Sequence, residues 1–180
     1  MKNETFSILG TQSTIEWVGR KVTGPHYGTI AVKEGKLRLR NGKLADGRIV
    51  VDTTSISILD ITDPTYKAQF GAHLASDDFF SSQNFPEAVL QIVSVDGRQV
   101  TGNLTIRGIT HPVQFETDIN EKDDVLSATA RLVVDRTNYG IKFRSGNFFI
   151  NLGDTLIHDN FELNVSLTAK RARVVSSVLV

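Results

Sequence analysis

The chain has 180 residues, with 20 basic and 20 acidic side chains and no cysteine. A nucleic-acid-binding protein normally carries a basic excess, so the zero net charge argues against that class. The missing cysteine excludes disulfides, thiolate metal sites and cysteine nucleophiles. Hydrophobic residues make up 40% of the chain, and the frequent Val, Ile and Thr, which branch at Cβ, favour strands. We therefore expect an all-β protein that folds as a single domain over residues 1–180.

The first residues lack the features of a targeting segment. Between Met1 and Gly10 the only apolar patch is Phe6 with Ile8 and Leu9, which is too short for the core of a signal peptide. No run of about 18 apolar residues could span a bilayer as a helix. We therefore expect a cytoplasmic protein without a transmembrane segment, or a periplasmic one if a leader has been trimmed.

Residue pairs typical of tight turns recur at intervals of about ten residues, the spacing of antiparallel barrels and sandwiches. These pairs are Glu34-Gly35, Asn41-Gly42, Asp46-Gly47, Asp96-Gly97, Arg107-Gly108 and Asp123-Asp124.

Between the turns, apolar and polar residues alternate with a period of two, which predicts strands with one buried and one solvated face. The change of parity between Val51 and Ile56 predicts a bulge that curves the sheet. The alternation is clearest over 99–106, 113–119, 126–134 and 161–167, with shorter pieces at 15–17, 30–32, 37–39, 49–51 and 56–58.

One helix is expected near residues 64–76. Asp63 is placed to cap its first turn, and Pro64 suits the first helical position because that position needs no N–H donor. Tyr66, Phe70 and Leu74 fall on one face of this helix.

Roughly eight strands with one apolar face can form a sandwich or a closed barrel, and a single helix covers little of that face. An eight-stranded barrel is wide enough to be filled by side chains or to hold one small ligand. Gly102, Ala128 and Ala130 are small residues at inward positions. They favour an apolar cavity, unless larger side chains opposite fill the space.

Several segments, in this order, resemble the YceI-like, polyisoprenoid-binding family over roughly residues 13–169. The segments are Trp17; His26-Tyr27-Gly28; His73 to Phe80 with Phe85-Pro86; Gly102 to Thr110 with Pro112-Val113; and Asp135 to Ile141.

The resemblance implies an extended, eight-stranded antiparallel barrel of lipocalin-like type, holding a long isoprenoid or other apolar lipid tail. It also implies a non-catalytic carrier or storage protein that forms a homodimer, with the isoprenoid or fatty-acyl lipid as ligand and no separate cofactor. An apolar tail is bound by shape and apolar walls, at about 0.8 kcal/mol for each buried CH₂. The expected ligand-binding residues are Trp17, Ile30, Leu39, Leu74, Phe79, Phe80, Leu104, Ile106, Phe115, Ala128, Ala130, Leu132, Phe161, Leu163 and Val165.

Few residues suggest chemistry. His26 and Arg136 are candidates for contacts with a polar head group, although a structural hydrogen bond in the turn at His26 and an ion pair of Arg136 with Asp78 or Asp135 are the favoured explanations. His73 and Asp77 have the spacing of two metal ligands on a helix, but a satisfied hydrogen-bonding pair is the simpler explanation, so no metal site is expected. No catalytic motif is present, and no catalytic residue is predicted.

Two alternative functions remain open. The barrel could process a lipid or quinone-like substrate with His26 and Arg136 at its mouth. Alternatively, the basic hairpin 33–48 could bind an anionic surface or partner, although a solvated strand face explains its charges equally.

The tail after Lys170, with Arg171 and Arg173 before Val174-Val175, is apolar enough to dock on the barrel or on a second subunit.

Overall fold

The computed structural model describes residues 2–172, which form nine strands and one α-helix. The helix α1 spans Pro64–Ala75 and lies between the fourth and fifth strands. The strands are β1 (Asn3–Ile8), β2 (Thr14–Lys21), β3 (Gly24–Arg40), β4 (Lys43–Ile58), β5 (Glu87–Asp96), β6 (Gln99–Ile106), β7 (Ile109–Lys122), β8 (Val125–Asp135) and β9 (Asn160–Arg171).

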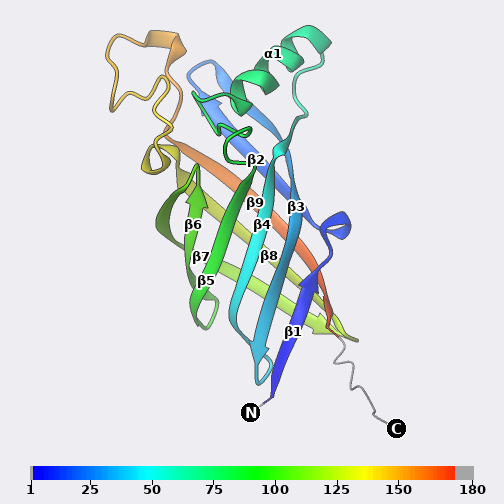
Figure 1. The fold of residues 1–180 in the computed structure, drawn as a ribbon. Coiled ribbons are helices and arrows are strands. Elements are labelled where there is room, and N and C mark those ends of the chain that lie inside the picture. The colour runs from blue at the N-terminus through cyan, green and yellow to red at the C-terminus, as the bar shows by residue number, and fades with distance from the viewer. Residues whose placement is uncertain (1, 173–180) are drawn as a thin grey trace.

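The strands form one antiparallel sheet that closes into a tall barrel (Figure 1). Pairing runs from β3 through β2, β9, β8, β7, β6 and β5 to β4, and the pairing of β4 with β3 closes the ring. β1 and β2 share one position of that ring, because both pair with β3 and β9 but at different heights. The ring therefore has eight positions, and the predicted eight-stranded antiparallel barrel is confirmed.

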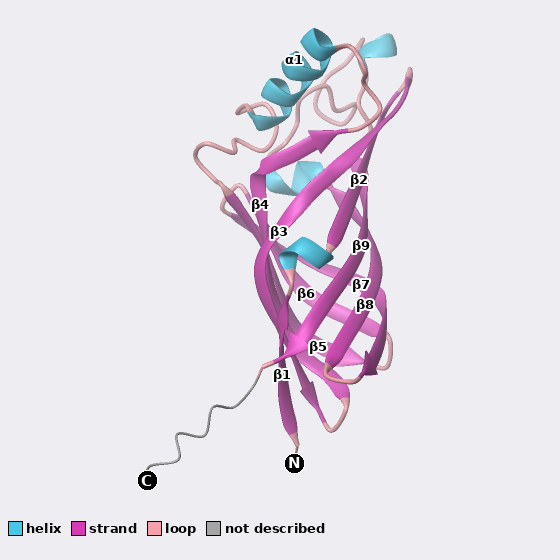
Figure 2. Ribbon diagram, turned by 90° about the vertical axis from the view of Figure 1, so that its right-hand side faces the viewer, coloured by secondary structure: helices cyan, strands magenta, loops and turns pink. Residues whose placement is uncertain are grey.

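The predicted helix is confirmed at one end of the barrel, which we call the mouth (Figure 2). The Asp63 carboxylate accepts hydrogen bonds from the Thr65 and Tyr66 amides, at 2.9 and 3.2 Å, which satisfies donors that the first helical turn leaves free. The start of β1 and the end of β9 lie toward the opposite end of the barrel (Figure 1).

Two of the six predicted turns are wrong. Gly35 and Gly47 lie inside β3 and β4, whereas the turns after Arg40, Asp96, Ile106 and Lys122 are present. A Cβ on Gly35 would lie 2.6 Å from the Arg48 carbonyl oxygen, and one on Gly47 would lie 2.8 Å from a methyl group of Leu37. These glycines therefore allow close packing between strands rather than reversal of the chain.

The predicted bulge between Val51 and Ile56 is confirmed. Thr29 pairs with Ser57 and Ala31 with Asp52, so β4 contains extra residues opposite Ile30. The extra length curves the β3–β4 ribbon toward the mouth, where a flat sheet could not close.

A well-packed plug closes the end of the barrel away from the mouth. It consists of Phe6, Leu39, Leu126 and Ala169, each no more than 1% exposed. Most of the rest of the predicted tail lies outside the described residues, but Arg171 at its start forms ion pairs with Glu4, Glu121 and Asp124.

The basic hairpin 33–48 is part of β3 and β4 and reaches the plugged end. Two of its cations are paired: Lys33 with Glu87 at 2.5 Å, and Arg38 with Asp46. The other four cations, Lys36, Arg40, Lys43 and Arg48, are exposed.

Candidate functional site

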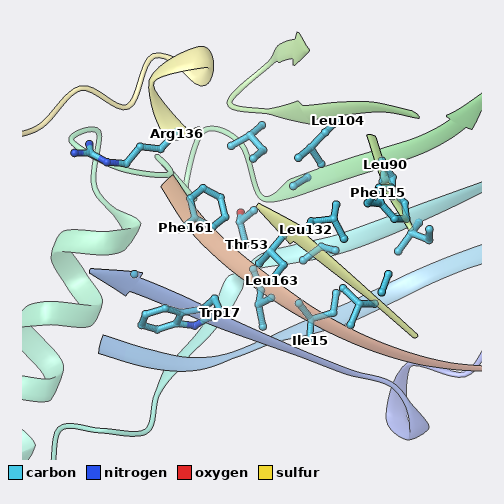
Figure 3. A pocket seen from close by; sticks show the side chains of 18 of the residues that line it. Ile15, Trp17, Thr53, Leu90, Leu104, Phe115, Leu132, Arg136, Phe161 and Leu163 are labelled. Carbon is cyan, nitrogen blue, oxygen red and sulfur yellow. The ribbon is translucent and has the colours of Figure 1, made fainter. Parts of the chain in front are cut away.

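A cavity of about 230 Å³ runs along the inside of the barrel between the plug and the mouth (Figure 3). On β9 its lining extends from Asn160 to Leu167, which is about 23 Å of strand at roughly 3.3 Å per residue. The space is therefore long relative to its volume, a shape that suits an extended chain better than a compact ring system.

The predicted ligand-binding residues line this cavity with one exception. Leu39 belongs to the plug, because at its level of β3 the interior is already filled by Phe6 and Leu126. All the others face the cavity, and Figure 3 shows Ile15, Leu132 and Leu163 converging from three strands.

The small inward residues have two different roles. Ala128 and Ala130 line the cavity, as expected of positions that leave space. Gly102 does not line it: a Cβ there would lie 2.9 Å from the Gln91 carbonyl oxygen and 3.0 Å from a methyl group of Leu90. Gly102 therefore lets β5 pack closely against β6 and adds nothing to the cavity.

Polar groups in the wall bond to the barrel itself. The hydroxyls of Thr53 and Thr117 donate to the carbonyl oxygens of Phe85 and Thr129, at 2.7 and 2.9 Å. The Trp17 indole N–H donates to the Thr29 carbonyl oxygen at 3.2 Å. These groups are already satisfied, so the wall presents an apolar surface to whatever fills the space.

Aromatic side chains cover the mouth. Phe79 lies between His73 of α1 and Phe143, with ring centres 5.0 and 5.6 Å away, and Phe80 packs edge-on against Phe161 of β9. Phe79, Phe80 and Leu74 all border the cavity, in the covering position expected for them. Phe70 of α1 borders it as well.

His26 is a polar group at the mouth whose bonding is incomplete. Its Nδ1 lies 2.7 Å from the Asp60 carboxylate, and its ring packs 4.7 Å from that of Phe70. Its Nε2 is buried and has no hydrogen-bond partner among the described residues. His26 borders the cavity, and its Nε2 is the side-chain atom of the cavity lining that is buried without a partner among the described residues.

The state of Asp60 determines which His26 nitrogen carries the proton. Partial burial raises the pKa of Asp60, but hydrogen bonds from the Tyr27 amide and from His26 outweigh it, so the pKa lies below its ordinary value. An ionised carboxylate only accepts hydrogen bonds, so Nδ1 carries the hydrogen. The Nε2 of a neutral ring is then an acceptor, and that of a protonated ring a donor.

Arg136 has a structural role in the strand-to-loop element. Its guanidinium donates to the carbonyl oxygens of His158, Ile141 and Ile157, at 3.0, 3.0 and 3.1 Å, and only 4% of the residue is exposed. In Figure 3 its charged end points away from the labelled apolar side chains. Burial lowers the pKa of Arg136, against the opposing effect of Asp159 and Asp135.

Arg136 forms an ion pair with neither Asp78 nor Asp135, whose carboxylate accepts hydrogen bonds from Thr137. Asp78 lies instead 3.0 Å from His73 Nε2, and the carboxylate that Arg136 approaches is that of Asp159, at 3.9 Å. Asp77 accepts a hydrogen bond from the Ser81 hydroxyl at 2.6 Å. Within residues 2–172, no three acidic or histidine side chains gather in a way that could hold a metal ion.

Sequence reasoning missed the contribution of β5, where Ala88, Leu90 and Ile92 line the cavity. The inward residues of β5 do alternate along the strand. The pattern is obscured because Val89 and Val93 on the outer face are also apolar. Asp60 was missed too, because nothing in its local sequence links it to His26.

Comparisons with known proteins agree with this architecture. The family model described as "YceI-like domain" matches residues 6–169. A UPF0312 protein, SA2479 of Staphylococcus aureus, is 33% identical over 78 residues, 39% of this chain and 46% of that protein. The protein YceI of Escherichia coli is 30% identical over 105 residues, 54% of this chain and 51% of that one. These alignments therefore span about half the length of the curated relatives.

Solved structures share the fold. BcnA of Burkholderia cenocepacia superposes with a TM-score of 0.68 at 18% identity, over 91% of this chain and 99% of that one. A polyisoprenoid binding domain from Saccharophagus degradans gives 0.67 at 12% identity, over 93% and 98%. No helix within residues 2–172 is long and apolar enough to cross a membrane. The matched segment, together with the closed barrel and its interior cavity, shows that the chain belongs to the YceI-like family.

Proposed function

We propose that this protein binds a long apolar lipid, of polyisoprenoid or isoprenoid-quinone type, inside the barrel and carries or stores it without chemical change. The observation that supports this most strongly is the cavity itself, which is long, lined by apolar side chains and closed at the far end by the plug. Burying a chain there gains about 0.8 kcal/mol for each CH₂ removed from water, without any specific polar contact.

The polar end of the lipid is proposed to lie at the mouth, next to His26. Among the described residues that line the cavity, its Nε2 is the buried side-chain atom that lacks a partner, and Asp60 fixes the ring from the other side. A hydroxyl or other donor on the lipid would complete its bonding. Arg136 is less suited to this role, because its donors already bind three carbonyl oxygens.

Native mass spectrometry of delipidated protein mixed with a polyprenol tests the proposal. We expect one lipid per barrel, displaced by a second polyprenol and not by a short alcohol, and the same spectra count the protomers of the expected homodimer. The variant Ile30→Asp, which places a carboxylate in the wall, should lose the adduct, whereas Val93→Asp on the outer face should retain it. Absence of any adduct from correctly folded wild-type protein would overturn the proposal.

The variant His26→Phe separates carrier from enzyme. A carrier should retain bound hydrocarbon tails while losing its preference for a polyprenol over the matching hydrocarbon. If the protein instead converts a bound lipid or quinone to a product, and His26→Phe abolishes that conversion, the carrier proposal fails.

A further inference from the structure

A loop beside the mouth exposes three consecutive apolar side chains while it buries a serine. We call residues 141–152, between the short helices Arg136–Tyr139 and Gly153–Thr155, the rim loop. Ile150 is 86% exposed, and Phe148 and Phe149 are about half exposed, whereas Ser145 in the same loop is fully buried. A loop adapted only to water would bury its apolar residues and expose its serine.

Specific contacts hold the loop in this arrangement. The Asp159 carboxylate accepts hydrogen bonds from the Ser145 hydroxyl and the Asn147 side-chain amide, both at 2.5 Å. The Ile157 amide donates to the Arg144 carbonyl oxygen at 2.9 Å. Phe143 packs 4.7 Å from the His73 ring of α1, which joins the loop to the covered mouth. The exposed apolar residues therefore belong to a loop whose conformation is held by specific contacts.

The charges of the rim loop have one sign. It contains Lys142 and Arg144 and no acidic residue. Lys142 Nζ lies 4.6 Å from the centre of the Phe148 ring, and the Arg144 guanidinium lies 4.9 Å from that of Phe143. Within residues 2–172 neither cation forms an ion pair with a carboxylate, so both remain free to meet an external anion.

Other exposed apolar side chains lie at the same end of the barrel. Val22 follows β2, Leu59 follows β4, and Tyr66 is on α1; each is between 44% and 53% exposed. Figure 1 shows the rim loop, the β2–β3 turn and α1 around the mouth, far from the plugged end. Aromatic and aliphatic side chains next to unpaired cations are the composition of segments that lie in the interface of an anionic membrane.

We propose that the rim loop docks the barrel mouth onto an anionic lipid bilayer, with Phe148, Phe149 and Ile150 entering the interface and Lys142 and Arg144 facing the phosphates. The mouth would then lie against the membrane, and a lipid could pass between bilayer and cavity without crossing water. Docking uses only surface residues, so it does not depend on what the cavity holds.

Sedimentation of delipidated protein with vesicles tests the proposal, using phosphatidylcholine alone or equal parts phosphatidylcholine and phosphatidylglycerol. We expect binding to the anionic vesicles that weakens with added salt. The double variant Lys142→Gln/Arg144→Gln should bind them roughly twenty-five-fold more weakly, since each cation near such a surface contributes about five-fold. The triple variant Phe148→Ser/Phe149→Ser/Ile150→Ser should lose at least about ten-fold, because the apolar contacts are removed.

Two matched controls keep the surface chemistry but change its place. Lys36→Gln/Lys43→Gln removes two exposed cations from the basic hairpin at the plugged end, and Val93→Ser removes an apolar side chain that is 52% exposed on β5. Both should bind vesicles like the wild type. Circular dichroism and polyprenol binding confirm that each variant is folded.

Three results would overturn the proposal. The wild type could fail to bind anionic vesicles, or the controls could weaken binding as much as the rim-loop variants do. The triple variant could also bind vesicles normally but change from dimer to monomer in light scattering, which would make the loop a contact between two copies of the chain. Failure of docking with intact polyprenol binding would leave the proposed function standing.

Discussion

Filling the cavity from its small residues gives opposite results for a hollow and for a solid barrel. Ala128 and Ala130 both line the cavity from β8, and Leu at either position places additional carbon atoms in the space. In a hollow barrel those atoms find room and leave water. In a solid core the same change overpacks the interior.

The size of the effect follows from the added surface. Ala→Leu adds about three CH₂ equivalents at about 0.8 kcal/mol each, so each variant should raise the free energy of unfolding of the delipidated protein by up to about 2 kcal/mol. The cavity, at about 230 Å³, has room for the new side chain. The same atoms displace a similar length of lipid, so the affinity for a polyprenol should fall roughly thirty-fold.

Urea unfolding of delipidated protein measures the first effect, and a polyprenol titration followed by native mass spectrometry measures the second. Gly102→Ala is the matched control, because Gly102 is also inward-facing but lies in closed packing, with the Gln91 carbonyl oxygen 2.9 Å from a Cβ there. It should destabilise the barrel, leaving polyprenol affinity unchanged. Leu39→Ala in the plug should cost about 2–5 kcal/mol and also spare the affinity.

The reasoning is refuted if both leucine variants destabilise the delipidated protein by about 1–3 kcal/mol, as overpacking does. Such a result would mean that the interior already behaves as a filled core.

Three further predictions follow from polar groups near the mouth. The Tyr139 hydroxyl is buried without a partner among the described residues, so Tyr139→Phe should raise the free energy of unfolding by about 1 kcal/mol; burial also raises the pKa of Tyr139 to about 12, and the variant should lose that step in an ultraviolet absorbance titration. A loss of stability would contradict this. The lowered pKa of Asp60 means that its contribution to stability is complete above its ordinary pKa of 3.8 and is lost as the pH falls through the lower folded value. Asp60→Asn should therefore flatten the acid part of the stability curve, and an unchanged curve would count against the His26–Asp60 contact. Arg136→Met leaves three carbonyl oxygens without their donor and should lower the unfolding free energy by about 3 kcal/mol in urea, while a change below about 1 kcal/mol would show that water replaces it readily.

Most of the fold could be predicted because its signals are local. Three kinds of signal depend only on neighbours in the chain. They are the alternation over 126–134 and 161–167, the helix cap at Asp63, and the turns at Asn41-Gly42 and Arg107-Gly108. The wrong turn predictions arose where contacts between residues far apart in the sequence determine the local structure. Gly35 and Gly47 resemble turn residues in sequence. In the fold, however, glycine is required there because a Cβ would clash with a neighbouring strand.

The candidate site shows the same division. Period-two alternation identified inward residues but gave no depth along the barrel, so Leu39 in the plug could not be distinguished from residues beside the cavity. The partners of Arg136 are backbone carbonyl oxygens, which no side-chain pattern reveals. The exposure of Phe148 and Phe149 depends on Asp159 holding the loop, a contact between segments that only the folded chain brings together.

An experimental electron-density map of the protein purified without organic solvent tests the central claim most directly. The account predicts continuous density of an extended chain along the barrel axis beside Ala128 and Ala130, ending within hydrogen-bond distance of His26 Nε2. Empty density, or side chains of the barrel closing the space between Ala130 and His26, would contradict it.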